Sequence, residues 1–257
     1  MYAFIFSGYL FSCGGVFMRY LITFSYDGTN FNGYQKQPNL RTIQGELESA
    51  LKFISGGNDI TVNSSGRTDK GVHALNQKAH FDLDKNITCY KLKCALNTYT
   101  KDDIYIKSVE AVADNFHARY NVLKKEYIYK INMGEYSPID RNYIFQYNKS
   151  LDIEKMSLEI KYLIGTHDFS AFCNMEDKKE SYIRTIYDAY ITLDNDIVVI
   201  KFIGNGFLKY QVRNMVGALI ECANKNKSIK TILESKKRQS FGKIAPACGL
   251  YLNNVEY

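Results

Sequence analysis

The sequence has 257 residues, of which 46% are hydrophobic and 23% charged, with a formal net charge of +6. This composition is typical of a soluble globular protein that buries one large core or two modest ones. The positive charge allows a polyanionic partner without indicating one by itself. The six cysteines form no C-x-x-C pair and do not cluster with the four histidines, so the sequence supports no metal site and predicts reduced thiols.

The first 17 residues are apolar and carry no charge. They lack the basic start and the cleavage site of a signal peptide, and glycines interrupt the run before it reaches the ~20 apolar residues of a membrane span. We therefore expect residues 1–17 to be an upstream extension, with Met18 as the natural start. No membrane association follows, and the protein is expected in the cytoplasm.

Alternating and helical hydrophobic patterns divide the region from residue 18 to residue 118. Apolar residues alternate over 19–26, which predicts a half-buried strand, and helical spacing over 43–54 predicts a helix that Gly56 and Gly57 end. A short segment at 60–63 leads into a polar loop at 64–71. The other predicted elements of this half are a strand over 77–83, a helix over 90–96 and a strand over 104–109.

The region from residue 119 to residue 257 again combines predicted strands with predicted helices. Its predicted elements are strands over 126–132, 183–193, 197–203 and 250–255, helices over 153–164 and 207–222, and a short helix capped by Ser228. The order predicts an α+β fold of two halves, each with a mainly antiparallel sheet and helices on one side. The boundary lies near residues 118–124.

The polar loop contains Gly66-Arg67-Thr68-Asp69-Lys70-Gly71-Val72-His73-Ala74. Its two glycines allow positive φ, which lets the backbone turn sharply and present the side chains between them. A guanidinium within about 4–6 Å would keep Asp69 ionised, as a nucleophile or a base requires. By residue types alone, an ordinary polar turn is the more common explanation of the segment. His73 is more often a hydrogen-bonding surface residue than a catalyst.

Three further positions carry possible chemistry. Arg213 lies in an apolar helix, where it either meets a carboxylate or extends to the surface. Tyr127 begins a strand and is by default a core or edge tyrosine. Basic and aromatic residues alternate around Tyr127 and at Lys209-Tyr210, which suits base stacking beside phosphate contacts.

Seven segments together resemble the tRNA pseudouridine synthase A family. They lie in the order of the family and cover essentially the whole chain from Met18 onward: residues 26–35, 66–74, 115–119, 125–127, 167–172, 212–217 and 245–250. The resemblance implies the pseudouridine-synthase fold, with two ferredoxin-like halves and an active-site cleft between them. It also implies an isomerase that needs no cofactor, converts uridine to pseudouridine at tRNA positions 38–40, and works as a homodimer.

The family's roles transfer residue by residue. The resemblance makes Asp69 the nucleophile or base, Arg213 its partner, and Tyr127 a residue that packs on the target base and moves a proton. Arg67 contacts the RNA and Leu250 lines the pocket, while Lys209 is a further candidate for substrate binding. The target uridine must leave its stack, at a cost of a few kcal/mol.

The sequence departs from the family's pattern at Tyr34, where a Trp is frequent, at Lys209-Tyr210 and in residues 1–17. Three alternatives stay open. The chain could modify other positions or another RNA, it could bind tRNA without catalysis, or it could be a hydrolase that uses Asp69 with His73. The intact Arg67-Thr68-Asp69 triplet argues against a pure binding protein, and a hydrolase would lack a second positioned acid.

Overall fold

The computed structural model describes residues 17–173, 181–225, 227–237 and 242–257. The expected upstream extension lies outside these residues, apart from Phe17. The strands are β1 (Met18–Tyr26), β2 (Asn63–Ser64), β3 (His73–Leu83), β4 (Ile104–Val112), β5 (Lys124–Asn132), β6 (Phe145–Gln146), β7 (Gly165–Asp168), β8 (Ile183–Asp194), β9 (Ile197–Gly204) and β10 (Leu250–Glu256). The α-helices are α1 (Ile43–Ile54), α2 (Cys89–Tyr99), α3 (Ile153–Glu159), α4 (Gln211–Asn224) and α5 (Ile229–Ser235).

The strands form one ten-stranded sheet, in the order β4-β1-β3-β10-β5-β9-β8-β7, with β2 on β3 and β6 on β5. The first half runs β1, α1, β2, β3, α2, β4, which is the ferredoxin-like arrangement. The second half repeats this arrangement with β5, α3, β8, β9, α4 and β10, and its strand order β10-β5-β9-β8 matches β4-β1-β3-β2. The predicted α+β fold class is therefore confirmed. The two halves share one arrangement of elements, although the sequence contains no residue-level repeat.

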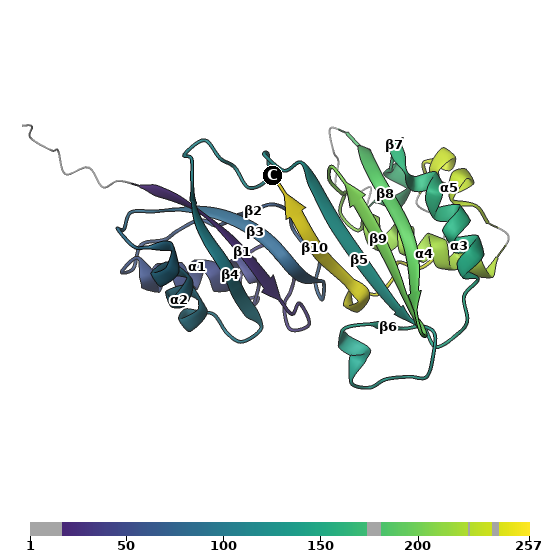
Figure 1. Ribbon diagram of the computed structural model, residues 1–257, viewed down its shortest axis with the longest axis horizontal. Helices are drawn as coiled ribbons and strands as arrows, with labels where there is room; N and C mark the ends of the chain where they lie inside the picture. Colours follow the sequence, from purple (N-terminus) through teal and green to yellow (C-terminus); the bar gives the residue numbers. More distant parts are fainter. Residues whose placement is uncertain (1–16, 174–180, 226, 238–241) are drawn as a thin grey trace, which may run out of the picture.

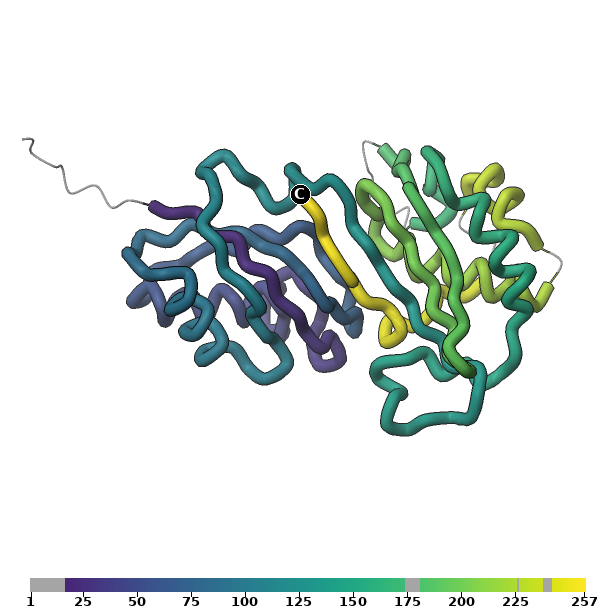
Figure 2. Tube along the Cα trace, in the orientation of Figure 1, coloured from purple at the N-terminus to yellow at the C-terminus, as the bar shows by residue number. Residues whose placement is uncertain are grey.

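The two halves share an edge in the middle of the sheet. β10 pairs in parallel with β3, through Tyr251 opposite His73 and Leu252 opposite Ala74. On its other side β10 pairs antiparallel with β5 over most of its length. Figure 2 shows the end of the chain returning to the centre of the molecule, between the N-terminal strands and β5. The predicted boundary falls in the connection from β4 to β5, and the division into two halves at that point stays a prediction.

The alternation read from the sequence places the core. In β1 the side chains of Tyr20, Ile22, Phe24 and Tyr26 are all at most 4% exposed. α1 buries its predicted apolar stripe, and Thr42 caps it by accepting a hydrogen bond from the Gly45 amide. α1 and α2 pack beside the N-terminal strands, while α3, α4 and α5 lie beside the C-terminal strands (Figure 1). No helix among the described ranges is long and apolar enough to cross a bilayer.

Two predicted helices differ from the structure. The helix expected over 153–164 ends at Glu159, continues as a 3-10 turn to Leu163, and is followed by the unpredicted strand β7. The helix expected from Phe207 begins only at Gln211. Tyr210 precedes it with φ of +65°, in the left-handed region, so residues 207–210 cannot continue the helix backwards.

Candidate active site

A central cavity of about 990 Å³ lies where the two halves meet, and residues of both halves line it. Its walls come from the segment 32–37, the loop 62–70, the β4–β5 connection, the start of β5 and the segment 207–213. The six site residues predicted from the sequence all line it: Arg67, Asp69, Tyr127, Lys209, Arg213 and Leu250. The fold therefore brings together side chains that lie far apart in the sequence.

The Asp69 loop, residues 64–71, is held by the segment that follows β1. The amide of Tyr34 donates to the carbonyl of Thr68 at 3.1 Å, and the Thr68 hydroxyl bonds that of Tyr26 at 2.8 Å. Gly28 packs so closely on the loop that a Cβ there would lie 2.0 Å from the carbonyl oxygen of Val72. The motif Tyr26–Gln35 thus serves as the base on which the loop rests.

The two loop glycines have different purposes. Gly71 has φ of +78°, as expected, which allows the turn closed by the Val72 amide on the Asp69 carbonyl at 3.2 Å. The expectation of positive φ at Gly66 is wrong. A Cβ at Gly66 would instead lie 2.8 Å from Nζ of Lys125, so this glycine leaves room for a side chain of the other half.

Asp69 and Arg213 form an ion pair inside the central cavity. Nη1 of Arg213 donates to Oδ2 of Asp69 at 3.2 Å, and the two side chains are only 14% and 19% exposed. Arg213 also donates from Nε to the carbonyl of Ala245 at 2.8 Å, which fixes its guanidinium. The guanidinium thus pairs with a carboxylate instead of extending to the surface from its apolar helix.

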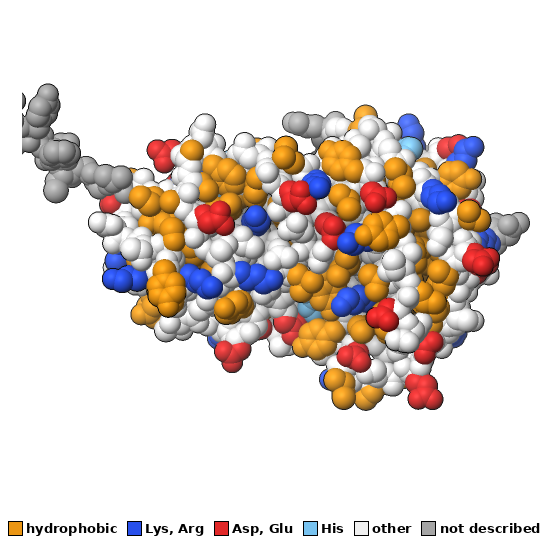
Figure 3. Space-filling model, in the orientation of Figure 1, with side chains coloured by type: hydrophobic (Ala, Val, Ile, Leu, Met, Phe, Trp, Pro, Cys, Tyr) orange, Lys and Arg blue, Asp and Glu red, His pale blue; other side chains and the backbone are white. Residues whose placement is uncertain are grey.

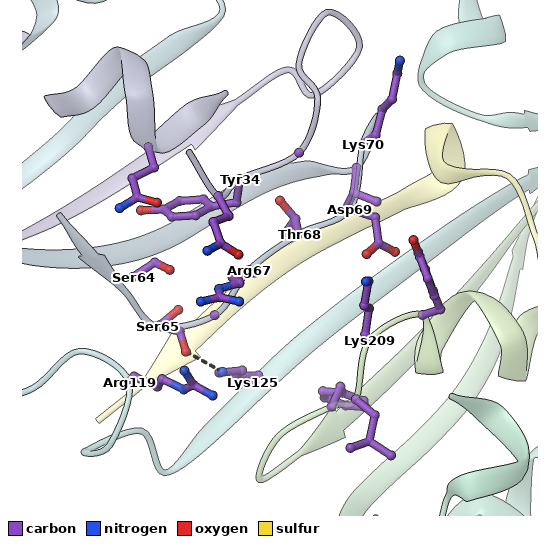
Figure 4. A pocket seen from close by; sticks show the side chains of 18 of the residues that line it. Tyr34, Ser64, Ser65, Arg67, Thr68, Asp69, Lys70, Arg119, Lys125 and Lys209 are labelled. Atoms are coloured by element: carbon purple, nitrogen blue, oxygen red, sulfur yellow. Dashed lines mark hydrogen bonds between the residues drawn. The ribbon is translucent and has the colours of Figure 1, made fainter. Parts of the chain in front are cut away.

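Opposing effects set the protonation of Asp69. Burial raises the pKa of Asp69 above its ordinary value, whereas Arg213 and Lys209 oppose that rise by favouring the charged form. Both cations also lie over the ring of Tyr210, at 5.6 Å for Arg213 and 5.4 Å for Lys209. The left-handed backbone of Tyr210 therefore helps to place two cations on one carboxylate. Figure 4 shows Lys209 directed toward Asp69.

Tyr127 and Leu250 supply the apolar part of the cavity. Tyr127 lies on β5 and is 8% exposed, with its ring edge-on to Phe207 at 5.1 Å between centroids. Burial, followed by the charges of Tyr26 and Asp69, raises the pKa of the Tyr127 hydroxyl. Leu250, 5% exposed, begins β10 next to β5. The hydroxyl of Tyr127 therefore stays protonated at neutral pH and can donate a hydrogen bond.

His73 does not join Asp69. It is 2% exposed, so the expectation of a surface residue is wrong. Its Nδ1 accepts from the amide of Gly28 at 3.1 Å, its Nε2 meets the carbonyl of Asn142 at 2.9 Å, and burial lowers its pKa. His73 lines a separate cavity of about 260 Å³ together with Asp27. The hydrolase alternative needs Asp69 and His73 in one site, and the structure places them in separate cavities.

The lining of the central cavity is strongly basic. Among the described residues it includes one carboxylate, that of Asp69, and seven cationic side chains: Lys36, Arg67, Lys70, Arg119, Lys125, Lys209 and Arg213. Such a lining attracts a polyanion and disfavours a cationic or apolar ligand. A buried carboxylate paired with arginine, beside a protonated tyrosine in a basic cavity, suits chemistry on a nucleic acid.

Comparison with known proteins agrees with this geometry. Residues 22–121 and 160–257 match the family described as tRNA pseudouridine synthase. The chain belongs to the tRNA pseudouridine synthase family.

Three curated relatives named tRNA pseudouridine synthase A are similar over almost their full length. That of Anoxybacillus flavithermus is 42% identical over 242 residues, which cover 93% of this chain and 98% of the relative. That of Streptococcus agalactiae serotype Ia is 44% identical over 245 residues, covering 93% and 95%. That of Geobacillus sp. strain WCH70 is 44% identical over 243 residues, covering 93% and 98%. The resemblance predicted from sequence motifs is confirmed.

Family membership does not identify every residue of the site. Sequence reasoning assigned no individual role to Lys125, Arg119 or Ser65, although all three line the central cavity. Nζ of Lys125 donates to the carbonyl of Ser65 at 2.6 Å, which links β5 to the Asp69 loop. The signals in the sequence were the matching segments 115–119 and 125–127, which include Arg119 and Lys125, and the alternation of basic and aromatic residues near Tyr127. The catalytic roles of Asp69, Tyr127 and Arg213 stay predictions.

Proposed function

We propose that this protein isomerises uridine to pseudouridine at positions 38–40 in the anticodon stem-loop of tRNA. The observation that carries the proposal is the buried pair of Asp69 and Arg213, set in a basic cavity beside Tyr127 in a member of this family. A loop or stem end is a favourable target because the uridine must leave its stack. Basic side chains that contact the backbone would accept neighbouring positions without strict reading of sequence.

The reaction moves one bond and balances without a co-reactant. The N1–C1′ bond breaks, the uracil turns within the cavity, and a C5–C1′ bond forms. The proton on C5 leaves and N1 gains one, so substrate and product are isomers. Asp69 acts as the nucleophile or base, Tyr127 stacks on the uracil and moves a proton, and Leu250 and Phe207 limit the space in which the ring turns. Arg67 and Lys209 hold the flipped nucleotide.

The pair of Asp69 and Arg213 explains how a buried carboxylate can act at neutral pH. Burial disfavours the charged form of Asp69, and the guanidinium of Arg213 opposes this effect by stabilising the charged form. Arg213 in turn avoids the cost of an unpaired charge in a largely buried position. The charge needed for catalysis and the stability of the site therefore depend on the same contact.

The direct test is an assay of the purified chain on an unmodified tRNA transcript, with no metal or nucleotide added. Pseudouridine mapped at positions 38–40 is the expected result. Pseudouridine elsewhere would redirect the proposal to another target, and tRNA binding without any pseudouridine would favour a non-catalytic protein. Loss of activity with a chelator, restored by one specific metal, would contradict a reaction without cofactor.

We further propose that the protein acts as a cytoplasmic homodimer. Support comes from large apolar side chains that stay exposed on the strands, among them Tyr105 on β4 and Tyr187 and Leu193 on β8, each more than half exposed. Figure 3 shows hydrophobic side chains spread among charged ones over the face seen in Figure 1. Sedimentation equilibrium of the pure protein should give about twice the mass of one chain, and a single-chain mass would exclude the dimer.

A further inference from the structure

Lys125 reaches from the second half of the molecule into the Asp69 loop. It lies on β5, two positions before Tyr127, and its Nζ donates to the carbonyl of Ser65 at 2.6 Å. The missing side chain of Gly66 makes this approach possible, because a Cβ there would lie 2.8 Å from Nζ. An ammonium has three donors. No carboxylate among the described residues forms an ion pair with Lys125, which lines the cavity, so the donors that Ser65 does not use can bind a ligand.

Two arginines that line the cavity also lack an acidic partner in the described part of the chain. Arg119 follows β4 and lies over the ring of Tyr120 at 5.9 Å. Arg67 is exposed in the Asp69 loop, next to Gly66. Figure 4 shows Arg67, Arg119 and Lys125 gathered on one side of the cavity, with Asp69 and Lys209 on the other. The cavity therefore has a second cationic cluster, separate from the pair that holds Asp69.

Like charges brought this close to one another repel, and a bound anion relieves the repulsion. Burial, followed by the charges of Arg119 and Arg184, lowers the pKa of Lys125 to about 8. The next residue on the same strand, Glu126, forms an ion pair with Lys201, with 3.2 Å between Oε1 and Nζ. No carboxylate of the described residues pairs with Lys125 in this way, so a ligand can supply the negative charge.

We propose that Arg67, Arg119 and Lys125 form a phosphate subsite, which binds a backbone phosphate flanking the target uridine. This inference rests on the proposed function. A nucleotide whose ribose lies at Asp69 carries its phosphates on that ribose, and Arg67 lies on the same loop two positions before Asp69. Two guanidinium groups and an ammonium supply the charge-assisted donors that a phosphate prefers. The subsite thereby orients the flipped nucleotide from its backbone while Tyr127 holds its base.

The subsite couples RNA binding to protonation of Lys125. The groups that act on its ammonium are the Ser65 carbonyl from the Asp69 loop, Arg119 from the β4–β5 connection and Arg184 from β8. Arg67 lines the same side of the cavity (Figure 4). A bound phosphate favours the charged ammonium and raises the pKa of Lys125. The free enzyme is charged here below pH about 8, so affinity for RNA is greatest there and falls as the pH rises above that value.

The first test measures binding and not turnover, so it is independent of the proposed reaction. Affinity of an unmodified tRNA transcript is measured as a function of salt for the wild type, Lys125→Gln and Arg119→Gln. Each variant should bind on the order of tenfold more weakly, with a salt slope smaller by about one. Lys91→Gln, an exposed lysine on α2, should match the wild type. Weaker binding with an unchanged salt slope in both cavity variants would overturn the subsite and leave Lys125 only a structural link.

A second test locates the phosphate. Anticodon-arm hairpins carry a neutral methylphosphonate at one position next to the target uridine. The wild type should lose affinity at one position, and Lys125→Gln should be insensitive at that same position. Equal sensitivity of both proteins at every position would refute the proposal. If the wild type makes no pseudouridine, the proposed function fails whatever these binding results are.

A third test uses pH. Wild-type affinity should decrease between pH 7 and pH 9, whereas Lys125→Arg, which stays charged, should hold its affinity over this range. Parallel decreases in both proteins would contradict a role for Lys125 in the pH dependence. Thermal unfolding of each variant checks that the comparison involves folded protein.

Discussion

Arg213 and Asp69 lie 144 positions apart in the sequence and meet at 3.2 Å between Nη1 and Oδ2. Arg213 comes from α4 of the second half and Asp69 from a loop of the first. The contact therefore spans the junction of the two halves as well as the active site. Any change that shifts one half relative to the other alters the distance on which the charge of Asp69 depends.

Asp69→Asn should bind tRNA and form no detectable pseudouridine. Asparagine keeps the shape of the side chain, but it can neither attack carbon nor take up a proton effectively. Turnover should fall by several orders of magnitude, while binding changes little and can tighten as one negative charge disappears. Single-turnover assays and filter binding measure the two effects. Asp188→Asn, an exposed change on β8, is the matched control, and wild-type turnover in Asp69→Asn would remove Asp69 from the mechanism.

Arg213→Gln should move the acid limb of the pH–rate profile to higher pH. In the wild type, burial raises the pKa of Asp69 and Arg213 opposes the rise. Without the guanidinium the carboxyl pKa rises further, so the active carboxylate is lost earlier as the pH falls. The profile of kcat/KM between pH 5 and pH 9 shows the shift, with exposed Arg141→Gln as the control. A limb that stays in place would mean that Arg213 does not tune Asp69.

Tyr127→Phe should keep affinity for tRNA and lose turnover by about 100-fold or more, in the range of general acid–base catalysis. The phenylalanine ring still stacks on the base and against Phe207, but the proton of the hydroxyl is gone. Tyr90→Phe, on the exposed surface of α2, removes a hydroxyl without a role in the cavity. Unchanged turnover would restrict Tyr127 to stacking, and lost affinity with normal turnover would contradict both roles.

Gly28→Ala should destabilise the protein and impair catalysis together. The new Cβ would lie 2.0 Å from the carbonyl oxygen of Val72, and because this atom belongs to the backbone the Asp69 loop itself must shift. We expect a loss of about 1–3 kcal/mol in the free energy of unfolding, as for overpacked sites. Gly206→Ala, whose Cβ would approach only the side chain of Arg184 at 3.9 Å, should change little. Normal stability in Gly28→Ala would show that the loop yields easily.

Much of this architecture is readable from the sequence. The alternating apolar residues of β1 and the helical stripe of α1 require a particular face to be buried, so periodicity alone predicts them. The pairing of Asp69 with Arg213 was implied by family motifs, since neither residue shows its partner through spacing. Local rules failed where distant segments decide the conformation. A Cβ at Gly66 would lie 2.8 Å from Nζ of Lys125 of the other half, a contact that no local pattern contains.

The late start of α4 has the same kind of explanation. Phe207, Leu208 and Tyr210 fit the helical hydrophobic pattern, but Tyr210 takes a left-handed conformation, so the helix begins only at Gln211. A tyrosine favours neither this backbone nor a turn, so its own preference predicts the wrong state. Lys209 and Arg213 lie over the ring of Tyr210, and both act on the charge of Asp69. Backbone strain of this kind is common at functional sites.

The place of β10 has a consequence for how the protein is made. β10 joins β3 to β5, yet it is synthesised after every other element described here. Until it emerges, the edges of β3 and β5 that face β10 have no partner, and the two halves are not joined through β10. The sheet that spans both halves is therefore completed only after β10 has been synthesised, late in the production of the chain.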